Sequence, residues 1–354
     1  MRKVYLLVLT IGLLLVKNEA QAQSETAELI KSGIVNAELL GKAYGTPLSK
    51  AFGTDINTGW ITTGEAFKPG RFEIRIFANA TFVPQKDQTF DVSTLGLNSN
   101  VRVASGSGTQ APTVFGADSP GPLLNVYATR PDTKQEEQVA SFNTPQGIGT
   151  NIAPIPMAQL SVGVVKGTEL MFRFIPESKV GDLKLNLWGI GIKNNVSQWL
   201  PALSALPFDL TAAVAFSSFR SNYGLQLNPQ SGVANPNPLD YSNQKVIFNS
   251  KAIMAQLVAS KTISVITGYA GVTYSQSHST TAMRGNYPVT TIREQAPYTK
   301  EIQNITDPVN IPLDYNQLGL TAGLRLKLSI LSINAEGTWA KYPTVSAGIG
   351  LGFN

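Results

Sequence analysis

Long stretches of the chain alternate between apolar and polar residues. In 318–330 every even position is apolar, whereas every odd position is polar or glycine. The same alternation recurs, with few exceptions, in 331–339, 343–353 and 71–83. Successive side chains of a strand point to opposite faces, so each run predicts a strand with one apolar face. These runs exceed the roughly 5–6 residues of ordinary globular strands and suit a tilted barrel that crosses a membrane.

We expect about twelve strands, within a range of roughly ten to fourteen because 280–293 could add a hairpin. The expected strands are 71–83, 98–107, 121–129, 156–165, 168–176, 181–193, 207–221, 244–260, 261–276, 315–328, 331–341 and 343–353. Within 181–193 the apolar phase switches at Leu187-Trp188, which predicts a β-bulge.

Short turns alternate with long polar stretches along the chain. Turns such as 260–261 and 329–331 are very short, and the long stretches are 84–97, 131–155, 222–243 and 277–314. This asymmetry and an even strand number predict an all-β fold, an antiparallel transmembrane β-barrel with both chain ends on the periplasmic side. A secreted soluble β-sandwich also alternates and stays open as an alternative.

The first 22 residues have the order of a secretory signal peptide. Arg2 and Lys3 precede an apolar run, 4–16, and the small-residue site Ala20-Gln21-Ala22 follows. We therefore expect cleavage after Ala22 and a location in the cell outer membrane. The alternative, an N-terminal membrane anchor, would need about 20 apolar residues, more than this run supplies.

Residues 23–70 differ from the barrel, which we place at 71–354. A helix is expected to start at Ser24, with apolar residues at broadly helical spacing, until Pro47 interrupts it; 52–60 has the composition of a loop. This lead either fills the lumen as a plug or sits at the periplasmic mouth as an extension. The residues that we expect to mark the plug are Tyr44, Pro47, Phe52 and Trp60.

The order of this lead, Trp60 and Gly70–Pro84 resembles the start of long-chain fatty-acid-transporter-like barrels, in which an N-terminal hatch enters the lumen. Three further segments are similar to an uncharacterised family of Gram-negative outer-membrane barrels, a domain of unknown function. These segments are Tyr44–Trp60, Gly189–Pro201 and Leu320–Phe353. The resemblance implies the barrel architecture and leaves the transported solute open.

Composition excludes several classes of protein. The 354 residues include 28 Lys and Arg, 23 Asp and Glu, one His and no Cys. Disulfides, thiolate zinc sites, cysteine nucleophiles and His-based metal clusters are therefore excluded, and scattered basic residues do not suit nucleic acid. His278 lies in the Ser-rich loop 275–279, and we expect it to be solvated rather than catalytic. The sequence predicts no enzyme, cofactor or metal.

Aromatic residues lie near the expected strand ends, where interfacial girdles sit in membrane barrels. The candidates are Phe82, Trp188, Trp199, Trp339, Tyr342 and Phe353. Burial in a protein core is the alternative. The expected partners are outer-membrane lipid and the barrel-assembly machinery, which would bind the C-terminal strand; the sequence leaves the oligomeric state open.

Closure of the barrel would bring 71–83 beside 343–353, then 331–341, then 315–328. The inward faces of these strands contribute a mainly basic luminal wall: Arg71, Glu73, Arg75, Arg325, Lys327 and Glu336. Acidic residues of the lead, Glu25, Glu28, Glu38 or Asp55, could pair with this wall, or the wall could attract an anionic solute. We expect a transporter or channel for a small hydrophobic or anionic solute, or else a sealed barrel that assists envelope assembly or secretion.

Overall fold

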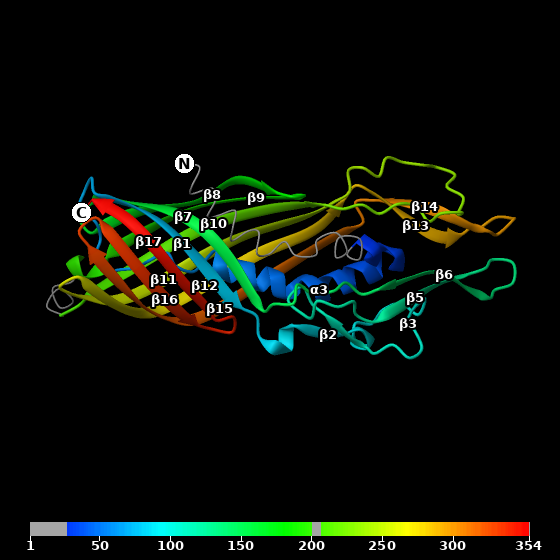
Figure 1. Ribbon diagram of the computed structural model, residues 1–354, viewed down its shortest axis with the longest axis horizontal. Helices are drawn as coiled ribbons and strands as arrows, with labels where there is room; N and C mark the ends of the chain where they lie inside the picture. The colour runs from blue at the N-terminus through cyan, green and yellow to red at the C-terminus, as the bar shows by residue number, and fades with distance from the viewer. Residues whose placement is uncertain (1–26, 200–206, 354) are drawn as a thin grey trace.

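The computed structural model describes residues 27–199 and 207–353, so the expected signal peptide and the expected helix start at Ser24 lie outside the described part. Its centre is a closed antiparallel barrel of ten strands (Figure 1). In sequence order these are β1 (Phe72–Phe82), β7 (Ile152–Val165), β8 (Thr168–Val180), β9 (Leu183–Asn195), β10 (Asp209–Gly224), β11 (Lys245–Ile263), β12 (Ile266–Arg284), β15 (Val309–Leu328), β16 (Leu331–Trp339) and β17 (Thr344–Phe353). The closed sheet excludes the β-sandwich.

Two of the twelve expected strands lie outside the barrel. The expected strands 98–107 and 121–129 correspond to β3 (Val101–Val103) and β5 (Leu123–Thr129), which form a separate sheet with β6 (Glu136–Asn143). Both are short and bounded by Gly and Pro, so neither can present a face long enough to cross a bilayer. The number of strands in the barrel is therefore ten, at the lower limit of the expected range.

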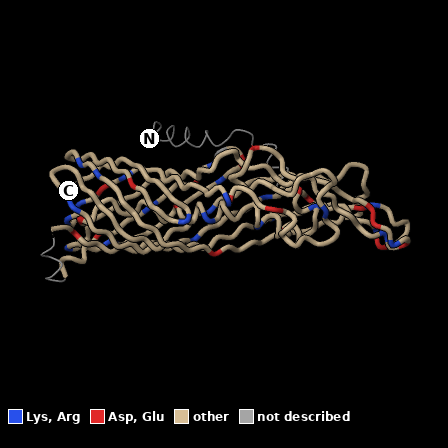
Figure 2. The backbone as a smooth tube through the Cα atoms, turned by 90° about the horizontal axis from the view of Figure 1, so that it is seen from below, with Lys and Arg blue, Asp and Glu red and all other residues tan. Residues whose placement is uncertain are grey.

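A folded crown extends beyond one end of the barrel (Figure 1). Besides the β3-β5-β6 sheet it contains two hairpins, β2-β4 and β13-β14. The bounds of these strands are β2 (Thr89–Asp91), β4 (Gln110–Pro112), β13 (Asn286–Ile292) and β14 (Lys300–Thr306). Apolar residues from these sheets share one buried cluster with the start of the described chain. Figure 2 shows acidic and basic residues gathered at the far tip of the crown.

The expected loop 277–314 is mostly strand. β12 continues to Arg284 and β15 begins at Val309, so these strands extend beyond the apolar band. His278 consequently lies on β12, where its Nδ1 is 2.7 Å from Asp314 Oδ1 on the neighbouring strand. The prediction that His278 lies in a loop is wrong. β12 and β15 continue as paired strands beyond the apolar band, and their residues there are mostly polar, as those of a loop would be.

The two ends of the barrel differ in their connections. At the turn end, residues 166–167, 264–265 and 329–330 form short connections between paired strands, the longer connection 196–208 joins β9 to β10, and β1 begins and β17 ends there. At the loop end, the long segments 83–151 and 285–308 form much of the crown. The expected order β1, β17, β16, β15 is confirmed by the strand register.

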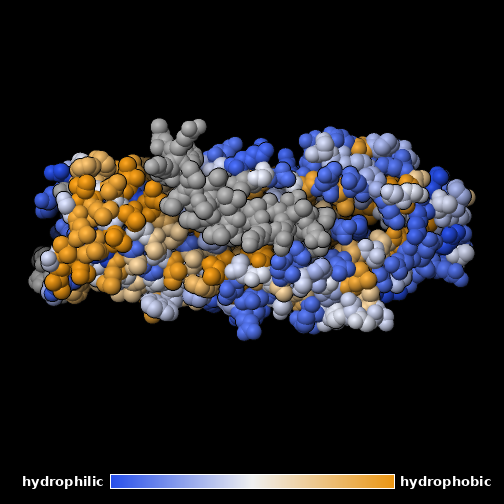
Figure 3. All heavy atoms as spheres, in the orientation of Figure 1, coloured by the Kyte–Doolittle hydropathy of each residue, from blue (hydrophilic) through white to orange (hydrophobic). Residues whose placement is uncertain are grey.

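The outward face of the barrel is an apolar band. Leu324 is 62% exposed and Ile349 is 56% exposed, although both are large aliphatic side chains. Figure 3 shows hydrophobic residues gathered over the barrel and hydrophilic residues over the crown. Trp188, Trp339 and Phe353 point outward within this band. The remaining outward candidates are Phe82, which is half-buried at the end of β1, and Trp199, which is exposed in the short helix η4 (Val196–Trp199).

Tyr342 does not belong to this aromatic set. It lies between β16 and β17, is 2% exposed, and its hydroxyl donates to Asp87 Oδ2 at 2.6 Å. Burial, together with the hydrogen bond and charge of Asp87, raises the pKa of Tyr342, so the phenol keeps its proton. The hydrogen bond of Tyr342 therefore links the β16-β17 connection to the short helix η2 (Gln85–Asp87) at the loop end.

The expected bulge at Leu187-Trp188 is wrong. β9 keeps one phase along its length, with Leu187 buried and Trp188 exposed. The register shift lies on its neighbour β8, between Ile175 and Ser178. The inward Leu185 and Leu187 of β9 face apolar residues of the plug rather than water. Both faces of the strand are therefore apolar there, which changes the phase of the apolar positions along the sequence.

α3 (Ile34–Asp55), preceded by the 3-10 turn η1 (Leu29–Ser32), runs from the crown into the barrel (Figure 1). The helix continues through Pro47, which was expected to interrupt it, and includes Phe52. Proline removes one backbone hydrogen bond and disfavours a helix interior. Packing inside the barrel sustains the helix here, as tertiary contacts usually do. No described helix is long and apolar enough to cross a lipid bilayer.

Candidate functional site in the barrel lumen

The plug, which we define as residues 34–64, runs through the lumen from the loop end to the turn end. At the loop end, Leu29 just before it is buried in the core of the crown. Farther in, Ile56 packs in a cluster with inward residues of the barrel. At the turn end, Gly64 N donates to Ser260 Oγ at 2.8 Å. The described chain thus threads the barrel before it forms β1 (Figure 1).

Two plug glycines allow the chain to approach the wall closely. A Cβ on Gly53 would lie 2.1 Å from Ser277 Oγ and 2.6 Å from Ser277 Cβ. Gly59 has φ +75°, and a Cβ there would lie 2.9 Å from Ser346 Oγ. Only glycine combines this conformation with this contact distance.

Two buried arginines hold the segment that follows α3. Arg173 on β8 is 1% exposed, and its Nη1 donates to Ile56 O at 3.1 Å and to Thr58 O at 3.0 Å. Its guanidinium carbon lies 4.0 Å from the centre of the Trp60 ring. Arg75 on β1 is 3% exposed, and its Nη2 donates to the carbonyl oxygen of Gly59.

The end of α3 explains why carbonyl oxygens meet these arginines. Residues 56–59 directly follow the last turn of α3, so their carbonyl groups have no partner within the helix, and the helix dipole adds negative charge at this end. Asn79 on β1 donates from Nδ2 to Asp55 O at 2.6 Å and to Thr58 O at 2.9 Å. Gln159 on β7 accepts at Oε1 from Arg75 at 3.2 Å and from Arg173 at 3.1 Å. The lumen therefore offers the plug a cluster of donors.

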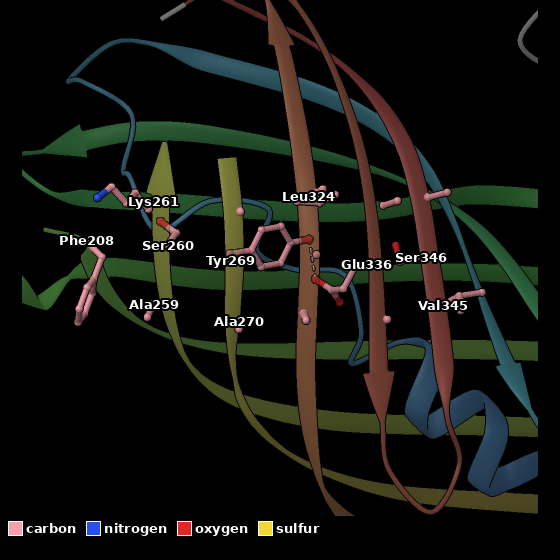
Figure 4. A pocket seen from close by; sticks show the side chains of 16 residues that line it. Phe208, Ala259, Ser260, Lys261, Tyr269, Ala270, Leu324, Glu336, Val345 and Ser346 are labelled. Atoms are coloured by element: carbon pink, nitrogen blue, oxygen red, sulfur yellow. Dashed lines mark hydrogen bonds between the residues drawn. The ribbon is translucent and has the colours of Figure 1, made fainter. Parts of the chain in front are cut away.

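The carboxylates of the barrel have partners of their own. Glu336 Oε2 accepts from Tyr269 at 3.0 Å, a hydrogen bond visible in Figure 4, and its Oε1 accepts from Gly59 N at 3.3 Å. Glu73 forms an ion pair with Arg325 and accepts from Ser332 at 2.9 Å. A second ion pair, Lys193 and Glu169 at 2.7 Å, also lies near the turn end. None of these carboxylates forms an ion pair with Arg75 or Arg173 in the described part of the chain.

Four of the six expected wall residues are buried in the lumen: Glu73, Arg75, Arg325 and Glu336. Arg71 is exposed just before β1, and Lys327 is half-buried near the turn end. The expected plug residues also lie against the barrel interior or crown. Trp60 and Pro47 are buried, Phe52 is half-buried among aromatic side chains, and the Tyr44 hydroxyl donates to Gln146 O at 2.9 Å.

The expected pairing of acidic lead residues with the wall does not occur in the described part. Glu28 pairs with Lys31 at 2.7 Å, and Asp55 Oδ1 accepts from Thr81 at 2.7 Å. Glu25 lies outside the described residues. Main-chain carbonyl oxygens at the end of α3 take the place that side-chain carboxylates were expected to fill.

Arg173, Gln159 and Asn79 complete this site, and none of them was among the site residues predicted from the sequence. The predicted wall included charged residues of only four neighbouring strands, whereas Arg173 and Gln159 come from β8 and β7. The alternation in 168–176 already places Glu169 and Arg173 on one face, so the signal was present. No group of three or more His, Cys, Asp or Glu residues suited to a metal ion occurs among the described residues.

Comparisons with known proteins give a family but no activity. A family model described as a family of unknown function (DUF6588) matches residues 1–353. The curated proteins contain no match.

Three solved structures are similar at low identity. The translocator domain of autotransporter NalP from Neisseria meningitidis is 8% identical, covers 81% of this chain and 89% of its own, and has a TM-score of 0.30. Ail, the attachment invasion locus protein of Yersinia pestis, is 9% identical, with coverages of 80% and 99% and a TM-score of 0.25. A Pseudomonas aeruginosa FadL homologue is 12% identical, with coverages of 84% and 96% and a TM-score of 0.23. At these values none of them indicates what this chain does.

Proposed function

The chain belongs to the DUF6588 family of unknown function, and we propose that it is an outer-membrane β-barrel whose plug gates a passage for small anionic solutes. The pair of buried guanidinium groups that converge on the end of α3 carries this proposal. Arg75 and Arg173 share one amide acceptor and otherwise bind plug carbonyl oxygens. A charged acceptor makes a stronger hydrogen bond than a carbonyl group does. A carboxylate or phosphate that reached these groups would therefore compete with the plug.

The outward face supports the membrane location. Soluble monomers rarely expose a large continuous apolar surface, whereas a membrane barrel carries an outward apolar band. Leu318, Leu320 and Leu324 follow one another on the outward face of β15 and are 62–74% exposed. The expected signal peptide agrees with export, and the crown, with its long connections, would face the cell exterior.

Planar-bilayer conductance of the purified protein tests the gating proposal. We expect the full-length barrel to be closed, and a variant lacking residues 23–64 to conduct with a preference for anions. Replacing Arg75 and Arg173 by Gln in that variant should reduce the anion preference, because the fixed positive charge in the lumen is lost. The matched control is Arg102→Gln in the crown, where the side chain pairs with Glu136 at the surface. A truncated barrel that assembles but stays closed, or that prefers cations, would overturn the proposal.

A second candidate function is that of a sealed barrel that presents its crown to envelope proteins. The observation in its favour is the core of the crown, in which Leu124 and Tyr287 are fully buried together with residues of η1. Loops with a core of their own form a fixed surface and can bind a partner without first becoming ordered. Arg75→Gln with Arg173→Gln in the full-length barrel, added to the same conductance series, distinguishes the two functions. A gated barrel should open more readily when the plug loses these hydrogen bonds, whereas a sealed scaffold should stay closed.

A further inference from the structure

A cavity lies at the turn end of the barrel, and neither Arg75 nor Arg173 lines it. Its volume is about 410 Å³, and it lies between plug-side residues 63–68 and the inner surface of β12 and β15. Residues from both sides line it, among them Lys68 on the plug side and Arg325 and Lys327 on β15. We call this cavity the vestibule. It opens toward the periplasmic side if the crown faces the exterior.

The vestibule presents mainly hydrogen-bond donors. Lys68 and Lys327 form no ion pair with any described residue, and Glu65 is the carboxylate that lines the cavity. Arg325 is 3% exposed and pairs with Glu73 through Nη2, but its Nε has no hydrogen-bond partner among the described residues. A buried guanidinium nitrogen without a partner is costly, so an acceptor in this cavity would be favourable.

Hydroxyl groups complete the lining. Thr63, Thr267 and Ser329 surround the same space as the basic side chains. Lysine and arginine at close range, with hydroxyl groups as additional donors, are the chemistry that binds phosphate oxygens in proteins. The volume falls within the range of roughly 300–1,000 Å³ that is usual for sites of small molecules.

We propose that the vestibule binds a small phosphate-class oxyanion from solution. The anion would contact Lys68 beside the plug and Lys327 on the barrel wall. Binding would therefore hold the plug against β15 at the turn end. Thr267, Arg325 and Lys327 lie on the lumen side of β12 and β15, which separates this site from the head groups of surrounding lipids. Binding requires only the closed barrel, so the inference does not rest on gating.

Thermal unfolding of the full-length protein in detergent tests this site. Inorganic phosphate, compared with chloride at equal ionic strength, should raise the unfolding temperature and saturate with concentration. Lys327→Gln and Lys68→Gln should each weaken the apparent affinity about tenfold or more, as expected for the loss of a charge-assisted hydrogen bond. Lys327→Arg should retain most of the affinity. The matched control is Lys261→Gln, an exposed lysine on the outward face of the adjacent strand β11.

Three outcomes would overturn the proposal. Stabilisation that does not saturate, or that is equal in all variants, would be a general salt effect. Stabilisation by micelles of an anionic phospholipid alone, lost in the Lys261 variant, would place the site on the lipid face. Arg75→Gln with Arg173→Gln should leave phosphate affinity unchanged, so this result and the conductance result can fail separately.

Discussion

Arg173 shows how a single residue connects the strand pattern to the luminal site. It lies on the inward face of β8, yet its donors reach main-chain oxygens of the plug rather than a carboxylate. A buried cation is tolerated where acceptors and an aromatic face surround it, as Gln159 and Trp60 do here. The alternation of the strand predicts that Arg173 points inward, but its partners depend on where α3 ends, which the strand pattern does not indicate.

Two glycines of α3 allow a direct test of how closely the plug fits. Gly53→Ala should destabilise the barrel by about 1–3 kcal/mol, because the new methyl group would meet Ser277 Cβ at 2.6 Å. Gly45→Ala, in the same helix, has nothing within 4 Å and should stabilise it by up to about 1 kcal/mol. Urea unfolding in detergent micelles measures both. Equal effects of the two substitutions would contradict a plug that contacts the wall.

Among the elements, those that cross the barrel were the easiest to predict. β15, β16 and β17 keep a strict alternation because one face meets an apolar exterior and the other a polar lumen. The crown strands have no such exterior, so 98–107 and 121–129 gave no reliable sign of where they belong. The prediction that Pro47 ends the helix was wrong, because packing inside the barrel outweighs the low helix propensity of proline.

The depth of a residue in the outward band sets the cost of a charge. Leu324 lies near the middle of the apolar outward run 318–330, whereas Leu328 on the same face is the last residue of β15. Leu324→Arg should cost about 2–4 kcal/mol and impair assembly, and Leu328→Arg should cost about 0–1 kcal/mol. Heat-modifiability on gels and unfolding in lipid vesicles measure these effects.

The control at Leu328 keeps the substitution, the strand and the face constant. Similar costs at both positions would show that the band is not a membrane surface. The neighbouring Arg325 is a poor control, because its ion pair with Glu73 is buried and Arg325→Leu would leave that carboxylate unpaired.

At the scale of the whole molecule, the threaded plug fixes which side of the membrane each part of the lead occupies. Val35 is 57% exposed at the loop end, and Arg71 is exposed at the turn end. The chain has no native cysteine, so single cysteines can be labelled without background. Val35→Cys should react with a membrane-impermeant maleimide on intact cells, whereas Arg71→Cys should react only after the outer membrane is permeabilised.

Labelling of Arg71→Cys but not of Val35→Cys on intact cells would reverse the orientation of the barrel. Labelling of neither would contradict exposure of the crown. A lead that stayed at the periplasmic mouth, the alternative that the sequence left open, would place both cysteines on the same side.

Both ends of the plug are anchored to the rest of the protein. Leu29, just before the plug, is buried in the crown, and the C-terminal end of the plug continues covalently into β1. The plug therefore cannot leave the lumen through either end of the barrel as a rigid body. The plug can move aside to widen the lumen only if its chain becomes longer between these two anchored ends. A helix stores about 1.5 Å per residue and an extended chain takes about 3.3 Å, so unwinding one turn of α3 releases about 6 Å of chain. The length of helix that unwinds would then set how far the lumen opens.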